Sequence, residues 1–285
     1  AVPFSECDLG DRQAVGQILR DEQIELVMHF AAFAFVGESV EEPLKYYENN
    51  VVATLRLLES MLENGVKQFV FSSTCATFGE PDVLPIVETT PQAPINPYGQ
   101  SKLDVENILK SFAHAYGLSF AAFRYFNAAG ASFDSAIGED WTYALNLIPV
   151  AIRAVLTGDQ ELQVFGDDYP TPDGTGVRDY IHVVDLALAH IGALNQNTLD
   201  RFEVLNIGAG KSTTVLELVS KFEDITGVPI KFKYLPRREG DLAAFCADSS
   251  KAFEIMSWKT ERNIKNICED TWRWHKLNPT GYGTD

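Results

Sequence analysis

The chain has 285 residues, of which 46% are hydrophobic and 22% charged, proportions that are ordinary for a globular protein of one or two domains. Its 40 acidic side chains outnumber its 23 basic ones, so the formal net charge is −17. Because binding to nucleic acid needs clustered Lys and Arg to neutralise phosphates, this balance argues against a nucleic-acid partner. No apolar run approaches membrane-spanning length and no signal peptide is visible, so we expect no membrane partner either.

The four cysteines are far apart in the sequence and show no metal-ligand spacing with histidine: Cys7, Cys75, Cys246 and Cys268. Structural zinc sites need closely spaced pairs of such ligands, so the sequence predicts no metal centre. Unpaired cysteines are typical of a reducing compartment. We therefore expect free thiols and a cytoplasmic protein.

The first half of the chain alternates between strand and helix patterns. Residues 2–9 predict a short strand, residues 12–21 a helix, and the apolar run 26–32 a second strand, in which His29 is interpreted as a core histidine. Residues 43–64 predict one long helix that ends before Gly65, and residues 68–74 a strand that ends in hydroxyl side chains. After a proline-rich loop come a helix that starts at Pro97 and a strand over 118–123. Such alternation predicts an α/β fold with a parallel sheet and helices on both faces.

The second half of the chain has a different rhythm. Helical periodicity covers residues 146–156, 185–194, 215–226 and 264–276, with Thr213 as the expected cap of the third helix. Strand patterns cover residues 162–165, 177–183 and 203–207, and a turn-rich loop occupies 169–176. We therefore expect a smaller α/β domain after residue 127.

The helix that begins at Pro97 carries a candidate chemical pair, Tyr98 and Lys102, which are one helical turn apart on one face. A tyrosine that acts as a base near neutral pH must lower its pKa from about 10 by roughly 3 units, or about 4 kcal/mol. One ammonium about 4 Å away supplies on the order of 4 kcal/mol at an effective dielectric of ~20. The alternative is an ordinary exposed pair of residues, and the spacing alone does not decide between the two interpretations.

Polar or small residues end three of the predicted strands, at residues 30–32, 72–74 and 125–127. In open parallel sheets, ligands bind outside the carboxyl ends of the strands. The sequence therefore predicts that these ends and Tyr98 meet in one crevice.

Several stretches of the chain form a recognisable set. They include His-Phe-Ala-Ala at 29–32, Ser-Ser-Thr at 72–74, Tyr-Gly-Gln-Ser-Lys at 98–102 and Pro-Arg-Arg-Glu-Gly-Asp at 236–241. The run Asp-Gly-Thr-Gly-Val-Arg-Asp-Tyr-Ile-His-Val at 173–183 is the most specific of them. Together these stretches resemble the extended short-chain dehydrogenase/reductase family and, within it, the UDP-glucose 4-epimerases. The resemblance implies a doubly wound, Rossmann-like parallel sheet in residues 1–127. It also implies a UDP-sugar-binding domain in 128–285, of which 177–207 return to the first part.

The resemblance also implies an activity, the interconversion of UDP-glucose and UDP-galactose with NAD as cofactor. Tyr98 would take the proton of the C4 hydroxyl while hydride leaves C4, and Thr74 would hydrogen-bond the hydroxyl. Lys102 would bind the nicotinamide ribose and lower the pKa of Tyr98. The 4-keto sugar would then rotate and be reduced on its other face. The family further suggests a homodimer.

Family positions are matched by the following residues. The expected NAD contacts besides Thr74, Tyr98 and Lys102 are Asp8, Leu9, Phe30, Ala31, Ala32, Phe33, Asn50 and Phe126. The expected UDP-hexose contacts are Asn127, Asn146, Phe165, Arg178, Arg238, Asp241 and Phe245. Phe245 matches a position where a bulky side chain accompanies unsubstituted hexoses. From the residues alone, surface ion pairs to Asp179 or Asp241 are the favoured interpretation of Arg178 and Arg238. Asn50 and Asn127 are equally consistent with structural caps.

The chain departs from the family pattern at its start. The family begins with a strand, a glycine-rich phosphate-binding turn, a helix and a second strand, and these are absent from the sequence. In the family's sheet they would lie between residues 2–9 and the strand at 26–32, so we expect residues 2–9 to lack a neighbour. We expect an N-terminally truncated epimerase that binds NAD poorly, and an active full-length parent.

Two alternatives remain at this point. A sugar-nucleotide 4,6-dehydratase shares the hydride chemistry but needs a carboxylic acid beside the hydroxyl residue, where this chain has Cys75 and Ala76. A non-catalytic nucleotide-sugar-binding relative would not need Thr74, Tyr98 and Lys102 together. Both alternatives fit the residues less well than an epimerase does.

Overall fold

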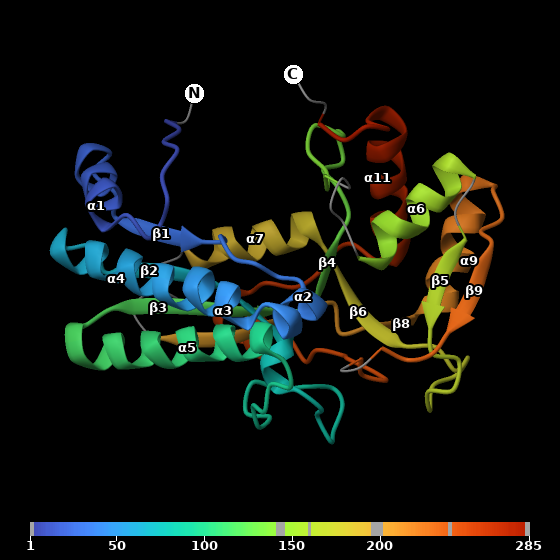
Figure 1. Cartoon of the computed structure of the whole chain (residues 1–285), viewed down its shortest axis with the longest axis horizontal. Coiled ribbons are helices and arrows are strands. Elements are labelled where there is room, and N and C mark those ends of the chain that lie inside the picture. Colours follow the sequence, from blue (N-terminus) through green and yellow to red (C-terminus); the bar gives the residue numbers. More distant parts are fainter. Residues whose placement is uncertain (1–2, 141–145, 159–160, 195–201, 239–240, 283–285) are drawn as a thin grey trace. The chain divides into compact units, whose positions relative to one another are not determined.

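The chain forms two compact units in the computed structural model (Figure 1), which describes residues 3–140, 146–158, 161–194, 202–238 and 241–282. Unit 1 comprises residues 1–81, 88–125 and 192–205, and unit 2 comprises residues 82–87, 126–191 and 206–285. Each unit therefore contains segments that are distant in the sequence. The predicted domain bounds at residues 127 and 128 stay a prediction.

Unit 1 is built on a sheet with the strand order β1 (Leu26–His29), β2 (Gln68–Thr74), β3 (Ser119–Tyr125) and β7 (Glu203–Ile207), of which 203–205 belong to this unit. The first three strands are parallel, with Leu26 opposite Gln68 and Gln68 opposite Ser119. The predicted parallel α/β fold is thus confirmed. Thr74 and Tyr125 lie opposite each other at the carboxyl ends of β2 and β3.

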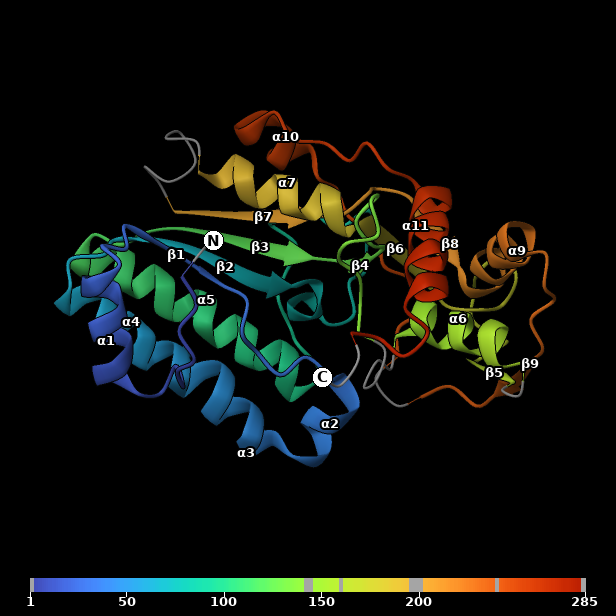
Figure 2. The same ribbon diagram turned by 90° about the horizontal axis from the view of Figure 1, so that it is seen from above.

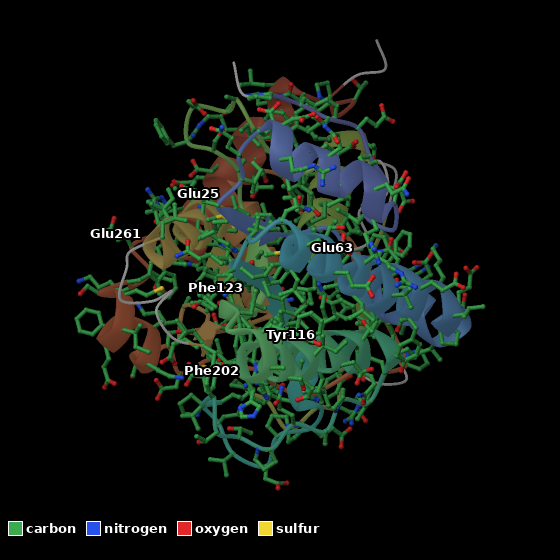
Figure 3. All side chains as sticks on the ribbon, turned by 90° about the vertical axis from the view of Figure 1, so that its left-hand side faces the viewer. Glu25, Glu63, Tyr116, Phe123, Phe202 and Glu261 are labelled. Atoms are coloured by element: carbon green, nitrogen blue, oxygen red, sulfur yellow. The ribbon has the colours of Figure 1, made fainter. Side chains whose placement is uncertain are left out.

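Helices α1 (Arg12–Asp21), α4 (Ala53–Glu63) and α5 (Pro97–Tyr116) cover one face of this sheet (Figure 2). Their apolar stripes and the strands form a core that includes Val15, Leu58, Met61, Phe69, Phe71, Leu109 and Phe120. Glu63 and Tyr116 end α4 and α5, and Figure 3 looks at this end of unit 1. The start of α5, with Tyr98, belongs to the opposite end, beside the carboxyl ends of the strands.

The helix predicted over residues 43–64 is interrupted. It consists of α3 (Pro43–Tyr46), a π-helical turn (Tyr47–Val52) and α4, and Gly65 follows with a φ of +73°. Short π segments inside helices frequently occur at functional sites. Here the turn contains the buried Asn50, whose side chain bonds to the backbone of Phe33 in the loop after β1. This loop leads into a short helix, α2 (Val36–Glu41).

The strand predicted over residues 2–9 is wrong, because the described residues 3–8 are irregular and α1 follows them. In the described part of the chain, β1 pairs with β2 on one side, and no strand pairs with its other side. A strand needs a partner for its backbone groups, so residues 3–8 have no ladder to join. This result agrees with the expectation that they lack a neighbour.

The described residues of unit 2 form two small sheets. In one, β4 (Asn127–Ala129) is parallel to β6 (Val177–His182), which is antiparallel to β8 (Ser212–Thr214). In the other, β5 (Leu162–Phe165) is parallel to β9 (Phe232–Leu235). The remaining described elements are α6 (Leu147–Thr157), α7 (Val183–Ala193, of which 183–191 belong to this unit), α9 (Val215–Thr226), α10 (Ser250–Met256) and α11 (Ile264–Leu277). The core packs α6, α9 and α11 on these strands and includes Ile148, Ile152, Leu162, Val164, Leu218, Phe222, Ile267 and Cys268.

The cap predicted for the third helix of this half lies one residue later than expected. Thr214, and not Thr213, accepts a hydrogen bond from the backbone N–H of Glu217, whose carboxylate accepts from the N–H of Thr214. This reciprocal capping box satisfies two donors of the first turn. Thr213 lies opposite Arg178 in the β6–β8 pair instead.

Candidate active site

The start of α5 is held tightly against the turn that follows β2. Asn96 caps the helix by accepting a 2.8 Å hydrogen bond from the N–H of Gly99, and Pro97 occupies the first turn. The 3-10 turn Cys75–Phe78 follows Thr74 directly. A Cβ atom on Gly99 would lie 2.6 Å from the carbonyl oxygen of Ala76, so glycine allows this close approach. The packing brings Tyr98 beside Thr74.

Thr74 and Tyr98 share a hydrogen bond. The Thr74 oxygen already accepts from the N–H of Ala76 at 3.1 Å, so its own hydrogen is free to donate to the phenol oxygen. Burial raises the pKa of Tyr98 to about 12, and the bond from Thr74 offsets part of that rise. Thr74 and Tyr98 are therefore in contact, and the phenol is neutral at pH 7.

Lys102 lies one turn further along α5 with 3% of its surface exposed. Its Nζ donates a 2.8 Å hydrogen bond to the carbonyl of Ser72 and lies 4.9 Å from the centre of the Phe71 ring. Burial lowers the pKa of Lys102 to about 8. The hydrogen bond to Ser72 directs the ammonium at the strand backbone, and the expected effect of Lys102 on the pKa of Tyr98 stays a prediction.

The buried amide of Asn50 fixes the loop that follows β1. It accepts from the N–H of Phe33 at 2.9 Å and donates to the carbonyl of Phe33 at 3.0 Å and to the Ser101 hydroxyl at 3.1 Å. Phe30 is 56% exposed and Phe33 37% exposed. Ala31 is exposed and Ala32 is half-buried. The predicted cofactor contacts of this loop are thus tied to α5 and remain accessible.

His29, at the end of β1, is the core histidine that we expected. Its Nε2 lies 2.8 Å from the Thr54 hydroxyl, and its ring packs against Phe69 and Phe71. Burial and the nearby Lys102 ammonium lower its pKa to about 4. It is therefore neutral at pH 7.

Two predicted cofactor contacts precede α1. The exposed Asp8 accepts a 2.7 Å hydrogen bond from the N–H of Gly10, and Leu9 packs partly on the core of unit 1. These contacts keep Asp8 and Leu9 with the segment before α1 and with the core, rather than with Tyr98 or Lys102.

In unit 2, two arginines flank one carboxylate. Arg178 donates to the carbonyls of Val177 and Leu242, and its Nη2 lies 3.8 Å from Asp241. Arg238 lies 3.9 Å from the same carboxylate, and its guanidinium stacks 3.7 Å from the centre of the Phe165 ring. Four predicted substrate contacts therefore lie together here.

The ion pairs of these arginines are loose. Asp179 is not a partner of Arg178, because its buried carboxylate accepts from the N–H groups of Ala209, Gly210 and Ala247 at 2.7–3.0 Å. The distances from Asp241 to both guanidinium groups exceed a normal hydrogen bond. An anion could thus compete with Asp241 for these guanidinium groups. Their neighbour Arg237 differs, since it is held by Asp168 at 2.7 Å.

The other predicted residues of unit 2 lie on separate elements. Phe126 and Phe245 are buried and meet edge to face, with ring centres 6.3 Å apart. Asn127 starts β4 opposite Tyr180, which fits the alternative of a structural residue as well as a ligand contact. Asn146 occupies the N-cap position of α6 without a side-chain capping bond, and its side chain hydrogen-bonds to Glu139 instead.

The sequence analysis placed residues 125–127 near Tyr98 but assigned no role to three side chains around the Tyr98 pair. Tyr46 packs edge to face on the Tyr98 ring, and Tyr125 hydrogen-bonds to the Ser72 side chain beside it. Glu106, one turn beyond Lys102, forms a buried ion pair with Arg124. The sequence did offer a signal for the ion pair: Glu106 on α5 and Arg124 in β3 are charged residues within otherwise apolar patterns.

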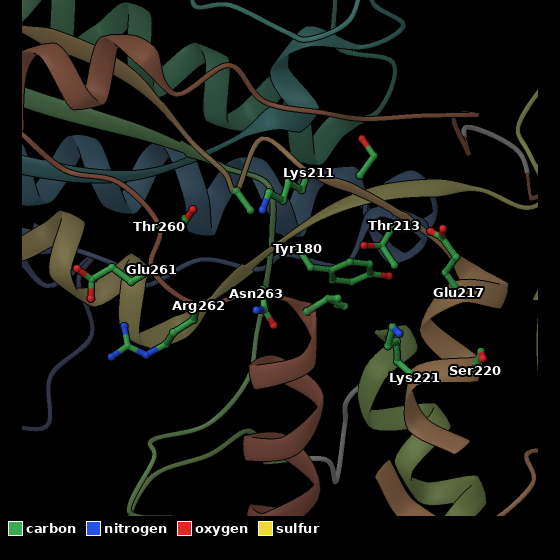
Figure 4. Close-up of a pocket in the computed structure, with 13 residues that line it drawn as sticks. Tyr180, Lys211, Thr213, Glu217, Ser220, Lys221, Thr260, Glu261, Arg262 and Asn263 are labelled. Atoms are coloured by element: carbon green, nitrogen blue, oxygen red, sulfur yellow. The ribbon is translucent and has the colours of Figure 1, made fainter. Parts of the chain in front are cut away.

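The described residues contain no cluster of His, Cys, Asp and Glu that could hold a metal ion. In unit 2, a cavity of about 510 Å³ lies between the first turns of α9 and α11 (Figure 4). Its wall includes Tyr180, Lys211, Glu217, Lys221 and Asn263, so none of the predicted site residues lines it.

Comparisons with known proteins extend over nearly the whole chain. The sequence model of the GDP-mannose 4,6 dehydratase family matches residues 1–271. The UDP-glucose 4-epimerase of Lactobacillus helveticus is 45% identical over 281 residues, which are 98% of this chain and 85% of that protein. The chain belongs to the family of the UDP-glucose 4-epimerases.

Solved epimerase structures agree with this assignment. The UDP-glucose 4-epimerase from Bifidobacterium longum in complex with NAD+ and UDP is 40% identical with a TM-score of 0.95, over 99% of this chain and 85% of that one. The enzyme from Stenotrophomonas maltophila with bound NAD and formylated UDP-arabinopyranose is 41% identical with a TM-score of 0.93, over 97% and 83%. The Rossmann-like fold class is thus shared with the epimerases. The dehydratase name describes the wider family, and Cys75 and Ala76 still follow Thr74 where a dehydratase needs a carboxylic acid.

The described residues include no helix that is both long enough and apolar enough to cross a membrane.

Proposed function

We propose that this epimerase interconverts UDP-glucose and UDP-galactose, with Tyr98 as the base that takes the C4 hydroxyl proton. The observation that carries the proposal is the hydrogen bond between Thr74 and Tyr98 beside the buried Lys102. NAD, when bound, supplies the hydride acceptor at C4 and returns the hydride later. The same tyrosine then gives the proton back, so the reaction is neutral overall.

The residues present in unit 1 fit the nicotinamide end of NAD. An ammonium has three donors, and the described contacts of Lys102 use one of them, on Ser72. The other two could bind ribose hydroxyls. Asn50 keeps the backbone of the loop at residues 30–33 in place, beside the accessible Phe30 and Phe33 rings. Asp8, Leu9 and Phe126 are the further NAD contacts of the proposal.

Lowering the pKa of Tyr98 is the main energetic demand. From about 12 to near 7 is about 5 units, or about 7 kcal/mol at 1.36 kcal/mol per unit. An ammonium near 4 Å contributes on the order of 4 kcal/mol at a dielectric of ~20. We propose that Lys102 turns from the Ser72 carbonyl toward Tyr98 when the site is filled, and that the cationic nicotinamide supplies the remainder.

Unit 2 supplies the residues that would hold the UDP-hexose. Planar guanidinium groups pair well with phosphate oxygens, so Arg178 and Arg238 would bind the pyrophosphate and displace Asp241 from its loose pairs. Phe165 would keep Arg238 in place, and Asn127 and Asn146 would contact the sugar nucleotide. Tight binding of the UDP part and weak binding of the sugar would allow the 4-keto ring to rotate and present its other face.

Phe245 favours unsubstituted hexoses. Its buried ring contacts Phe126 and would leave less room for an N-acetyl group than a small side chain would. We therefore propose UDP-glucose and UDP-galactose as the substrates, rather than their N-acetylated forms.

We also propose that the enzyme is a cytoplasmic homodimer. Exposed apolar side chains on the helices of unit 1 support the dimer, among them Leu44 at 68% and Val52 at 47% exposed. The free cysteines support a reducing compartment. The interface would involve the helices over 44–64 and 98–115.

The experiment that tests the function is a coupled assay of UDP-galactose conversion with added NAD, together with a titration of the protein with NAD. At saturating NAD, which offsets a weak affinity for the cofactor, we expect conversion by the unsubstituted chain, and a loss of at least 1000-fold in kcat for Tyr98→Phe with little change in KM. Proton transfer by a positioned side chain contributes roughly 10²–10⁴-fold, which sets this magnitude.

Three results would oppose the proposal. Conversion that survives Tyr98→Phe would exclude the proposed base. NAD and UDP-hexose binding without conversion would favour a non-catalytic binding protein. Release of a 4-keto-6-deoxy sugar would favour a dehydratase.

A further inference from the structure

The carboxylate of Glu106 lies on the same face of α5 as Tyr98 and Lys102, eight and four residues beyond them. It is fully buried, and so is its partner Arg124 on β3. Arg124 donates to Glu106 through Nε at 3.0 Å and through Nη2 at 2.7 Å, which is a two-pronged ion pair. The pair joins α5 to β3 inside unit 1.

A second contact joins Glu106 to β2. The hydroxyl of Ser73 donates to Oε1 of Glu106 at 2.5 Å, and Gln92 donates to Oε2 at 3.4 Å. Ser73 directly precedes Thr74, and Arg124 directly precedes Tyr125, at the strand ends beside Tyr98. One carboxylate thus contacts the carboxyl ends of two strands and the helix that carries the predicted base.

We infer that Glu106 is a positioning residue: through Ser73 and Arg124 it holds α5 against the ends of β2 and β3 and so sets Tyr98 and Lys102 relative to Thr74. The inference rests on the proposed function, because it assigns a task to the same site. Glu106 itself touches no reacting atom.

Arg124 has further contacts besides Glu106. The other arm of Arg124 donates to the carbonyl of Glu88 at 3.2 Å, and its guanidinium lies 4.9 Å from the centre of the Phe78 ring. Phe78 ends the same 3-10 turn whose Ala76 carbonyl touches Gly99. The arginine therefore supports the turn after Thr74 from one side while α5 supports it from the other. A displacement of Glu106 would be transmitted to both members of the hydrogen-bonded pair.

A purely structural ion pair is the competing explanation, and a charge-neutral double variant separates the two. Removing one partner leaves an unpaired buried charge, whereas replacing both by apolar side chains of similar volume is often tolerated. Glu106→Met/Arg124→Met therefore removes the contacts to the strand ends without stranding a charge. Leu58→Ala, a buried variant in the same core on α4, serves as a control for reduced stability without a change in these contacts.

The first readout needs no activity. In the chain labelled with ¹⁵N-lysine, with Lys102→Met for assignment, the Lys102 ammonium should titrate with a pKa of about 8. In the double variant we expect a shift of at least one unit toward the ordinary lysine value, because Lys102 leaves the Ser72 carbonyl and gains water. In Leu58→Ala the titration should stay unchanged.

The second readout is the pH profile of kcat with NAD and UDP-galactose. We expect the double variant to lose at least 10-fold in kcat with KM within twofold, and the acid limb of the profile to move to higher pH. The groups that face Tyr98 from neighbouring elements are Thr74, Cys75, Tyr46 and Tyr125, and they are retained. Ser73→Ala, which keeps the ion pair, should show the same changes at about a third of the size and serves if the double variant does not fold.

The inference is overturned if the folded double variant, or Ser73→Ala in its place, keeps the Lys102 titration and the pH profile of the unsubstituted chain. If the unsubstituted chain itself shows no conversion, the proposed function fails, and the lysine titration still decides the role of Glu106.

Discussion

The pKa values of single side chains at the strand ends depend on burial more than on their neighbours. Burial raises the pKa of Tyr98 and lowers those of Lys102 and His29. At pH 7, Tyr98 and His29 are therefore neutral, whereas Lys102, with a pKa of about 8, is still mainly charged. Under the proposed function, in which Tyr98 takes the sugar proton, this is the state before ligands bind, and a bound cationic cofactor would lower the pKa of Tyr98.

His29 gives a prediction for the pH dependence of stability. Its pKa is about 4 in the folded chain, against the ordinary histidine value of 6.5 that we take for the unfolded chain, so the unfolded chain binds the extra proton between these values. Its share of the stability is complete above pH 6.5, falls as the pH drops and levels off below pH 4. The loss is about 3 kcal/mol for a shift of about 2.5 units.

Between pH 6.5 and 4, we expect the free energy of unfolding of His29→Gln to fall by about 3 kcal/mol less than that of the unsubstituted chain. Urea unfolding at pH 7.5, 6 and 5 measures the slope. Equal slopes in both proteins would contradict the assignment of His29 as a neutral buried histidine.

At the scale of elements, the N-terminus of α5 and the turn after β2 act as one unit of structure. The cap from Asn96, the close approach at Gly99 and the bond from Thr74 all lie within one turn of Tyr98. Helix α5 is 20 residues long, so its position is set by many contacts, but its first turn decides where the phenol points. A small displacement of this first turn would therefore move the phenol of Tyr98 away from Thr74.

Gly99→Ala tests this packing. The added methyl would meet the Ala76 carbonyl oxygen at 2.6 Å, so we expect a loss of about 1–3 kcal/mol in stability and at least 10-fold in kcat. Gly37→Ala is the matched control, since nothing lies within 4 Å of its Cβ position on α2. Thermal unfolding and the conversion assay compare the two, and equal behaviour would show that α5 tolerates the shift.

At the scale of the whole molecule, the chain passes between the two units several times. Unit 1 needs residues 192–205, because residues 203–205 of β7 extend its sheet and Phe202 stacks on Phe120 at 5.9 Å. Unit 2 needs residues 82–87, because Ile86 exchanges backbone hydrogen bonds with Cys246 and Asp248 at 2.8 Å. Neither unit is a continuous segment.

Cutting the chain at one point should therefore give no complete unit. We expect fragments 1–125 and 126–285, expressed separately, to lack the dispersed amide spectrum and the near-ultraviolet circular dichroism of the full chain. Mixing the two fragments should recover part of both signals. A fully folded fragment on its own would show that the exchanged segments contribute little.

Much of the fold could be predicted from local pattern. The bounds of α1, β2, β5 and β7 agree with the expectation, because hydrophobic periodicity is a local signal. The start of α5 at Pro97 was predicted from a local signal too. The strand expected over residues 2–9 failed for a non-local reason, since a strand forms only beside a partner. The prediction of one unbroken helix over residues 43–64 failed for a similar reason, because the interrupting turn contains Asn50, whose side chain bonds to the distant loop at Phe33.

The same division holds for the site. The sequence by itself determined which residues are available, since Thr74, Tyr98 and Lys102 and the long run at 173–183 are visible without coordinates. Only the tertiary structure decided what each group does at rest: Lys102 donates to the Ser72 carbonyl, Asp179 binds backbone N–H groups, and Glu106 pairs with Arg124. Residue type and spacing follow from the chain alone, whereas a charge's partner and its exposure to water depend on which distant segments pack around it.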